Sequence, residues 1–339
     1  MKRWLRRAGS VGLLTSILSL AQGTQAVAAD GGKLFAYVSL DETVAHQLLA
    51  AFEKDTGIHV EFVRLSTGEA TARMQAEKSN PQASVWLGGV GLGHAEAKEK
   101  GLSQPYLAKG SEAVPAKYRD AQGSWGGIYL GVLAFAVNKN KIKQLGLTPP
   151  QTWKDLLDPK WKGHIQLPNP GTSGTSYNLI TTLITKDGEA GAFDYLKELH
   201  KNVSQYTRSG AAPTKNVALG ETVVAVGYAQ DMLKLIHETN APLEVIYPKD
   251  GTGYEIAAVS LIKDAKQADL AKKLIDWLYT PHASQVLADQ YIAPIVRKGT
   301  NLKKGSLPPS EVKLIDTDVD WAAKNKQRLI EEWNEKVNG

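Results

Sequence analysis

The sequence predicts a two-lobed α/β fold in which two long strands cross between the lobes. Two observations lead to this prediction. Short apolar runs alternate with amphipathic segments along most of the 339 residues, which is the pattern of a sheet covered by helices. Two longer β-prone runs, residues 126–138 and 254–262, interrupt that rhythm, and another α/β unit lies between them. Two crossing strands of this kind form a hinge that lets the lobes close on each other.

The elements before the first long run alternate between strand and helix. Residues 33–39, 58–65 and 84–87 are short and β-prone, whereas residues 42–56, 67–79 and 92–100 have helical spacing. In the first of these helices, Leu48, Leu49 and Phe52 fall on one face, which is the face expected to cover the sheet.

The same alternation continues between the two long runs. Strands are predicted at 163–167, 223–228 and 243–247, and helices at 176–186, 191–202 and 230–239. Three more helices follow the second long run, at 268–279, 283–291 and 320–337. We therefore expect a discontinuous first lobe (30–137 and 263–339), a second lobe (138–254), and hinge strands near 130–138 and 254–262.

The N-terminal segment has the features of a secretory signal peptide. It contains a basic start, an apolar run at 11–20 and small residues at 26–29, with no cysteine for lipid attachment. A membrane span needs about 20 apolar residues, more than this run provides. We expect residues 1–29 to be removed, with cleavage near Asp30, and the mature protein to occupy the periplasm without a membrane anchor.

Composition excludes several classes of protein. The formal charge is +5, and removing the four basic residues of the signal peptide lowers it to about +1. Such a balance offers no electrostatic basis for binding nucleic acid or a membrane surface. The chain has no cysteine, so disulfides, thiolate metal sites and cysteine nucleophiles are excluded. The histidines are scattered and there is no Gly-x-Ser-x-Gly motif, so we expect neither an enzyme nor a cofactor.

The most informative segment is residues 169–176, NPGTSGTS, which follows a predicted strand and opens a predicted helix. Glycines permit a tight turn, hydroxyls surround them, and a helix N-terminus adds unpaired N–H groups with partial positive charge. Such a turn suits a phosphate, phosphonate or carboxylate, and an ordinary helix cap is the alternative. The candidate anion-binding residues are Thr172, Ser173, Gly174, Thr175 and Ser176.

Further candidates lie where other strands turn into helices. Ser39, Thr67 and Glu69 are expected to contribute from the opposing lobe, with simple helix capping as their alternative role. Asp231 follows a buried strand, and Glu255 enters the second long apolar run, where an acid is costly unless it is paired or bound to a ligand. These two acids are expected to hold hydroxyls or an amine.

The chain resembles type II periplasmic binding proteins of the group that binds ferric ion or organophosphates. The segments that carry the resemblance include 66–69 (STGE), 80–86 (NPQASVW), 88–89 (GG), 153–157 (WKDLL), 172–175 (TSGT) and 251–255 (GTGYE). They span nearly the whole mature chain. The resemblance implies a receptor for a small anionic ligand that docks on an inner-membrane ABC permease, and it adds Gly89 to the expected site.

The tyrosine content near the strand at 223–228 indicates to which subgroup of these binding proteins the chain is most similar. Ferric-binding members use adjacent tyrosines near the strand at 223–228, whereas this chain has only Tyr228 there. The sequence is more similar to binders of hexose phosphate, phosphoglycerate and aminoethylphosphonate, in which the residues matching Asp231 and Glu255 hold the organic part. We expect a monomeric binder of a sugar phosphate or similar organophosphate. The alternatives are an aminoalkylphosphonate binder, an Fe(III) binder using Tyr228 and Glu69, and an exported phosphatase.

Overall fold

The structure is a computed structural model that describes residues 32–338, so the predicted signal peptide lies outside the described residues. The strands are β1 (Lys33–Ser39), β2 (His59–Arg64), β3 (Val85–Val90), β4 (Ser103–Gln104), β5 (Gly126–Asn138), β6 (Ile165–Pro168), β7 (Val203–Thr207), β8 (Val224–Tyr228), β9 (Leu243–Ile246), β10 (Thr252–Ile262), β11 (Ala293–Pro294) and β12 (Leu314–Ile315). The helices are α1 (Glu42–Thr56), α2 (Thr67–Ala76), α3 (Gly91–Glu99), α4 (Lys139–Leu145), α5 (Gly174–His200), α6 (Ala212–Leu219), α7 (Ala229–Thr239), α8 (Ala268–Trp277), α9 (Pro281–Asp289) and α10 (Val319–Lys336).

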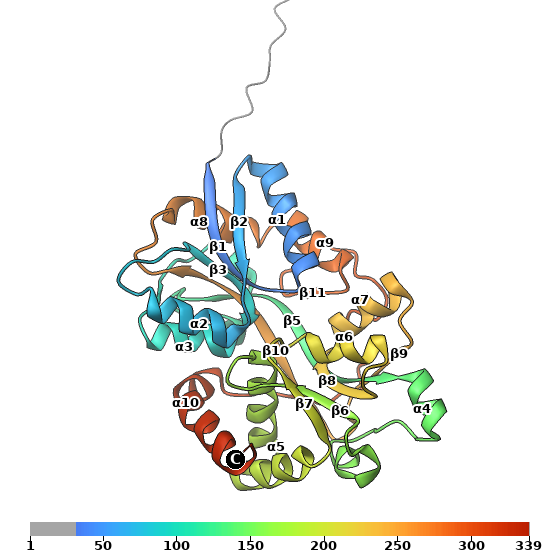
Figure 1. Cartoon of the computed structure of the whole chain (residues 1–339). Coiled ribbons are helices and arrows are strands. Elements are labelled where there is room, and N and C mark those ends of the chain that lie inside the picture. Colours follow the sequence, from blue (N-terminus) through green and yellow to red (C-terminus); the bar gives the residue numbers. More distant parts are fainter. Residues whose placement is uncertain (1–31, 339) are drawn as a thin grey trace, which may run out of the picture.

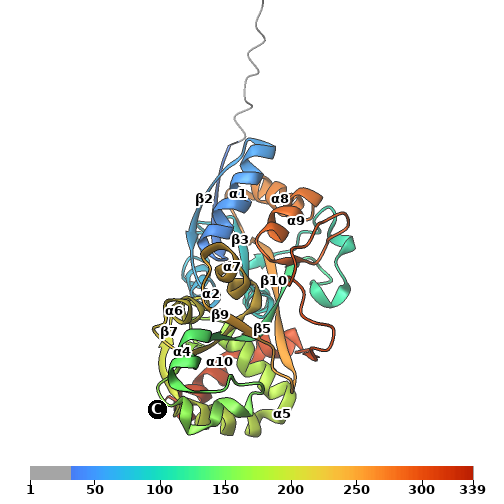
Figure 2. The ribbon, with the colours of Figure 1, turned by 90° about the vertical axis from the view of Figure 1, so that its right-hand side faces the viewer.

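Two long strands connect the two ends of the molecule. The main strand order is β2-β1-β3-β10-β5-β8-β6-β7. The first part of β5, residues 126–132, pairs with β10, and its second part, residues 133–137, pairs with β8. In both views α1 and α8 lie toward one end, α5 and α10 lie toward the other, and β5 and β10 run between them (Figures 1 and 2). The predicted α/β class and the two crossing strands are confirmed.

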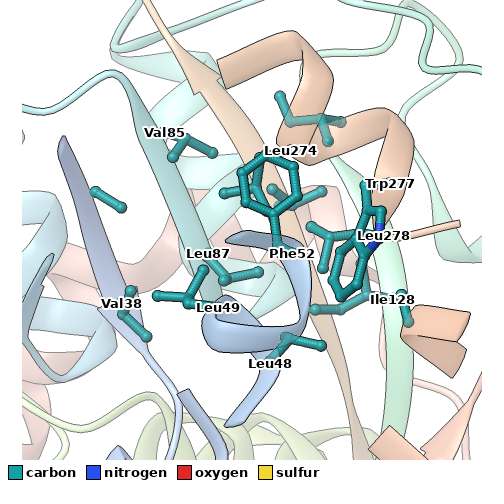
Figure 3. Close-up of a cluster of buried hydrophobic side chains, with 14 of the residues drawn as sticks. Val38, Leu48, Leu49, Phe52, Val85, Leu87, Ile128, Leu274, Trp277 and Leu278 are labelled. Carbon is teal, nitrogen blue, oxygen red and sulfur yellow. The ribbon is translucent and has the colours of Figure 1, made fainter. Parts of the chain in front are cut away.

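The first of two main hydrophobic cores lies between β1–β3 and the helices α1, α8 and α9. Phe52 of α1 is fully buried and meets Trp277 of α8 edge to face, with 5.6 Å between ring centroids (Figure 3). Leu48 and Leu49 join Phe52 in this core, as the helical spacing predicts. We call the elements around this core the first lobe.

The second core lies between β5, β6 and β8 and the helices α5 and α10. Phe135 of β5 packs edge to face on Trp153, and α10 contributes Leu329 and Trp333. We call the elements around this core the second lobe. The helix α10 also packs along α3, where Lys326 forms an ion pair with Glu96. The boundaries of the lobes stay a prediction, and the core contacts favour placing α10 with the second lobe.

Most predicted elements are present within a few residues of their expected ends. The helices predicted at 176–186 and 191–202 are the two halves of α5, which is interrupted at Gly188 by a left-handed φ of 75°. The short helix α4 and the strand β7 were not predicted. The residues of β7 read VSQYT and only one of them is buried, so the strand lacks the apolar run by which sequence patterns are detected. Within residues 32–338, no helix is long and apolar enough to cross a membrane.

Candidate ligand-binding site

A polar cavity of about 460 Å³, part of it open to solvent, lies where the two lobes meet. Its lining comes from the carboxyl ends of strands and the helices that follow them: Ser39 at the end of β1, Arg64 at the end of β2, Ser173 before α5 and Tyr228 at the end of β8. Open α/β sheets bind ligands at this edge because strand ends and helix N-termini expose unpaired backbone groups there. The location agrees with the expectation from the sequence.

Ser173 occupies the N-cap position of α5 but does not act as a cap. Its side chain makes no capping hydrogen bond, and its buried hydroxyl oxygen has no hydrogen-bond partner. Gly174 and Thr175 follow in the first helical turn and line the same cavity. A buried hydroxyl without a partner is costly, so this geometry favours a bound acceptor over simple capping.

The structure does not bring all five residues of the predicted anion turn to the cavity. Ser173, Gly174 and Thr175 line it, but Thr172 and Ser176 do not. The Thr172 hydroxyl donates instead to the backbone oxygen of Arg208, at 2.9 Å. Ser176 lies within α5, where successive residues point about 100° apart, so it cannot face the cavity together with its neighbour Thr175.

Three of the residues predicted in the first lobe line the cavity: Ser39, Thr67 and Gly89. Glu69 does not. Its carboxylate accepts the N–H of Ser66, the N-cap of α2, and forms an ion pair with Arg208 of the second lobe at 2.6 Å. The capping role considered for Glu69 is therefore present in the structure, and Ser66 rather than Thr67 is the N-cap.

A buried pair of stacked aromatic rings, Trp86 and His94, orients the side chain of Ser39. The indole N–H of Trp86 donates to the Ser39 hydroxyl oxygen at 2.9 Å. The ring of His94 stacks on Trp86 with 3.7 Å between centroids, and His94 is itself hydrogen-bonded to Ser260 and to the backbone oxygen of Gly88. Because Trp86 occupies an acceptor position of the hydroxyl, the hydroxyl proton remains available to a ligand.

Replacing Trp86 with phenylalanine is expected to weaken ligand binding about fivefold, which corresponds to about 1 kcal/mol for one lost orienting hydrogen bond. The measurement is a double-mutant cycle by calorimetry with S39A. In the S39A background, W86F should cause little further loss, because Trp86 acts through Ser39. Independent, additive losses would show that Trp86 does not position Ser39.

Carboxyl and phenol groups form another part of the cavity lining. Glu255 of β10 is buried, and its Oε1 accepts the side-chain N–H of Gln230 at 3.0 Å. Burial and the charge of Asp231 raise the pKa of Glu255 well above its usual value, although hydrogen bonds from Gln230, Tyr228 and Tyr129 oppose that shift. A protonated carboxyl in this position can both donate to and accept from hydroxyl groups.

Asp231 lies beside this group at the start of α7. Burial, together with the charge of Asp41, raises its pKa to about 6. Asp41 behaves in the opposite way. Although burial alone would raise its pKa, its bonds to Lys215 and Lys234 hold the pKa at about 2. Two acids close together therefore differ in pKa, because only Asp41 has direct cationic partners.

Three contacts across the cavity show that the lobes are closed on each other. The Gly68 N–H of the first lobe donates to the backbone oxygen of Thr172 in the second, at 2.9 Å. Asp41 forms ion pairs with Lys215 of α6 and Lys234 of α7. The described structure is thus a closed form, in which a ligand would be surrounded by both lobes.

Several lining residues were missed by the sequence analysis, notably Arg64 and Tyr129. Arg64 ends β2 immediately before the segment 65–68, so its place at a strand end was the available signal. Tyr129 lies within a long apolar run, where nothing distinguishes it from a packing residue.

The residues considered for Fe(III) are not brought together. Tyr228 lines the cavity, whereas Glu69 is held outside it by Arg208. Asn178 donates to the Tyr228 hydroxyl at 3.1 Å, and burial raises the pKa of that phenol well above its usual value. Among residues 32–338 there is no cluster of three or more His, Cys, Asp or Glu residues placed to hold a metal ion.

Two lobes, two crossing strands and a polar cavity between them define a solute receptor of the periplasmic binding protein class. The chain belongs to the family described as bacterial extracellular solute-binding proteins, whose model matches residues 94–321. Members of this family are substrate-binding proteins of ABC transporters rather than enzymes, and they act with a membrane permease. The two-lobed fold class and the family resemblance are confirmed.

The relatives differ in their ligands. The periplasmic binding protein AfuA from Actinobacillus pleuropneumoniae, solved with fructose-6-phosphate bound, is 35% identical with a TM-score of 0.87, over 91% of this chain and 99% of that one. A putative 2-aminoethylphosphonate-binding periplasmic protein of Salmonella paratyphi A is 30% identical, over 69% and 68% of the two chains. Iron uptake protein A1 of Synechocystis is 28% identical, over 84% and 81%.

Proposed function

We propose that this protein captures a small organophosphate, in particular a sugar phosphate, and delivers it to an ABC permease as a monomer in the periplasm. The observation that carries the proposal is the buried hydroxyl of Ser173, which has no partner and stands at the uncapped N-terminus of α5. The first half of α5, up to Gly188, has more than three turns, so its dipole adds positive potential at this point.

The acidic end of the cavity supports a sugar rather than an amine as the organic part. Burial raises the pKa of Glu255 well above its usual value, which favours a protonated carboxyl that can donate to and accept from a hydroxyl group. Asp231, with a pKa of about 6, is largely ionised at pH 7 and accepts hydrogen bonds from hydroxyl groups. An ammonium group would be better matched by two ionised carboxylates. The relative solved with fructose-6-phosphate agrees with this choice.

Titration calorimetry and thermal unfolding with four probes test the proposal: fructose 6-phosphate, fructose, 2-aminoethylphosphonate and Fe(III). A ligand that binds only the native state raises the unfolding midpoint by mass action. We expect a shift with fructose 6-phosphate and none with fructose. A shift only with Fe(III), or only with the aminophosphonate, would overturn the sugar-phosphate assignment.

Ser173→Ala is expected to weaken binding of fructose 6-phosphate by about 10- to 150-fold, since a hydrogen bond to a charged group contributes about 1.5–3 kcal/mol. Calorimetry checks this expectation. The matched control is Ser204→Ala on the exposed strand β7, whose hydroxyl donates to the backbone oxygen of Ile165 outside the cavity. Equal affinities in S173A and S204A would show that Ser173 takes no part in binding.

A further inference from the structure

Arg64 is the one cationic side chain that lines the cavity within the described part of the chain. It stands at the carboxyl end of β2, on the first lobe. Its guanidinium makes three contacts, to the backbone oxygen of Leu40 at 3.3 Å and to the hydroxyls of Ser66 and Ser209 at 3.4 and 3.2 Å. Leu40 and Ser66 belong to the first lobe and Ser209 to the second, so Arg64 spans the closed cleft.

The contact with Ser209 brings the guanidinium close to the anion turn. The next residue, Gly210, packs directly on that turn: a Cβ placed on it would lie 2.3 Å from the Thr175 hydroxyl and 2.9 Å from the Ser173 hydroxyl. Both Gly210 and Ala211 line the cavity as well. Arg64 therefore approaches the part of the cavity that Ser173 and Thr175 line.

Arg64 keeps donor groups for a ligand. A guanidinium has five N–H groups, and the three contacts use the Nε group and one hydrogen on each terminal nitrogen. One hydrogen therefore remains on each terminal nitrogen. All three contacts are at the long end of the hydrogen-bond range, so they are readily exchanged for shorter bonds to an anionic oxygen.

The charge at this end of the cavity matches a dianion. A helix N-terminus is equivalent to roughly half a positive charge, and an arginine adds a full one. A phosphate monoester carries about −1.5 to −2 at pH 7. The α5 terminus alone, with about half a positive charge, balances only part of the charge of a phosphate. The terminus and Arg64 together approach the charge of a phosphate monoester.

We propose that Arg64 completes the anion site and makes it select a dianionic phosphate ester over a monoanionic ester of the same shape. This inference rests on the proposed sugar-phosphate function. It assigns recognition of the ligand's charge to one residue of the first lobe. A bound phosphate would then contact both the N-terminus of α5 in the second lobe and Arg64 of β2 in the first.

Arg64→Met tests the inference against Arg208→Met. Arg208 also spans the cleft, through its ion pair with Glu69, but its side chain is 82% exposed and does not line the cavity. Both variants lose an interlobe contact, and only R64M loses a cation of the cavity. Binding of fructose 6-phosphate and of fructose 6-sulfate, which has the same shape and one charge, is measured by calorimetry at pH 7.5.

We expect wild-type protein and R208M to prefer the phosphate over the sulfate by about 10-fold or more. In R64M, phosphate affinity should fall about 10- to 100-fold and the preference should largely disappear. Arg64→Lys should retain part of the preference, because it keeps the charge but not the fork of donors. Ligand-free unfolding temperatures of all variants verify folding.

The outcomes separate this inference from the proposed function. If wild-type protein binds fructose 6-phosphate but R64M and R208M lose affinity equally for both esters, Arg64 contributes only to closure and the inference is overturned. If wild-type protein binds neither ester, the proposed function itself fails.

Discussion

Gly68→Ala is expected to weaken ligand binding by about 30- to 100-fold while leaving the ligand-free protein fully folded. A Cβ on Gly68 would lie 2.6 Å from the backbone oxygen of Gly171 and 2.9 Å from that of Thr172, both in the second lobe. Backbone atoms cannot move aside as a flexible side chain would. The clash exists only in the closed form, so the variant should favour the open form, and apparent affinity falls with the population of the binding-competent state.

The ligand-free fold should tolerate this change. Gly68 is the second residue of α2 and its φ is not in the left-handed region, so alanine suits its backbone. Calorimetry gives the affinity, and small-angle scattering with and without ligand reports closure. Gly191→Ala is the control, because a Cβ placed there would lie 3.5 Å from the Cβ of Asp187, which is an ordinary van der Waals distance. Wild-type affinity in G68A would show that ligand is bound without the Gly68–Thr172 contact.

Asp231→Asn is expected to stabilise the ligand-free protein at pH 7 by on the order of 2–3 kcal/mol and to weaken ligand binding about tenfold or more. The pKa of Asp231 rises from 3.8 to about 6 because the carboxyl is buried beside Asp41. At pH 7 the folded protein therefore holds a carboxylate that would be more favourable in the unfolded chain. Asparagine removes that charge, and with it an acceptor for the ligand's hydroxyls.

The pH dependence gives the sharper measurement. Between about pH 4 and pH 6 the folded state holds a proton on Asp231 that the unfolded state has lost, so the free energy of unfolding decreases as pH rises through this range. Asp41, with its pKa of about 2, acts in a separate range: the stability it contributes is present above pH 3.8 and is lost as pH falls toward 2. Glu255, whose pKa is also raised, adds to the decrease of stability with rising pH in both proteins.

Urea unfolding from pH 4 to pH 8 compares the two proteins. The decrease between pH 4 and pH 6 should be smaller in D231N than in wild-type protein, and stability at pH 7 should be higher. Asp194→Asn, on the exposed face of α5, is the matched control and should follow the wild-type curve. Parallel curves for wild type and D231N would mean that Asp231 does not hold a proton in the folded state.

Local patterns in the sequence predicted most elements because each has its own periodicity or turn chemistry. The helix at 42–56 was predicted with its observed ends, since Asp41 caps it and Gly57 terminates it in a left-handed conformation. The strand β7 and the helix α4 were missed because both are short and each has a single buried residue, and their positions depend on neighbouring strands and caps.

The candidate site was predicted in part for the same reason. Ser173, Gly174 and Thr175 were found because a hydroxyl- and glycine-rich turn opening a helix is a local signal. Thr172 and Ser176 belong to the same segment, but the rotation of the chain directs them away from the cavity. Glu69 satisfies a local cap and an ion pair with Arg208, a residue distant in sequence, so its role was decided by tertiary contact.

The sequence by itself determined the α/β class, the two crossing strands and the hydroxyl- and glycine-rich turn that opens α5, because hydrophobic periodicity and turn residues act over a few neighbouring positions. The tertiary structure decided which residues distant in the sequence meet in and around the cleft. Arg64 meets Ser209, Trp86 orients Ser39, and Gly68 bonds to Thr172, each across many intervening residues. These contacts follow from the packing of the two lobes around β5 and β10. A local sequence pattern does not indicate which strand ends this packing brings together.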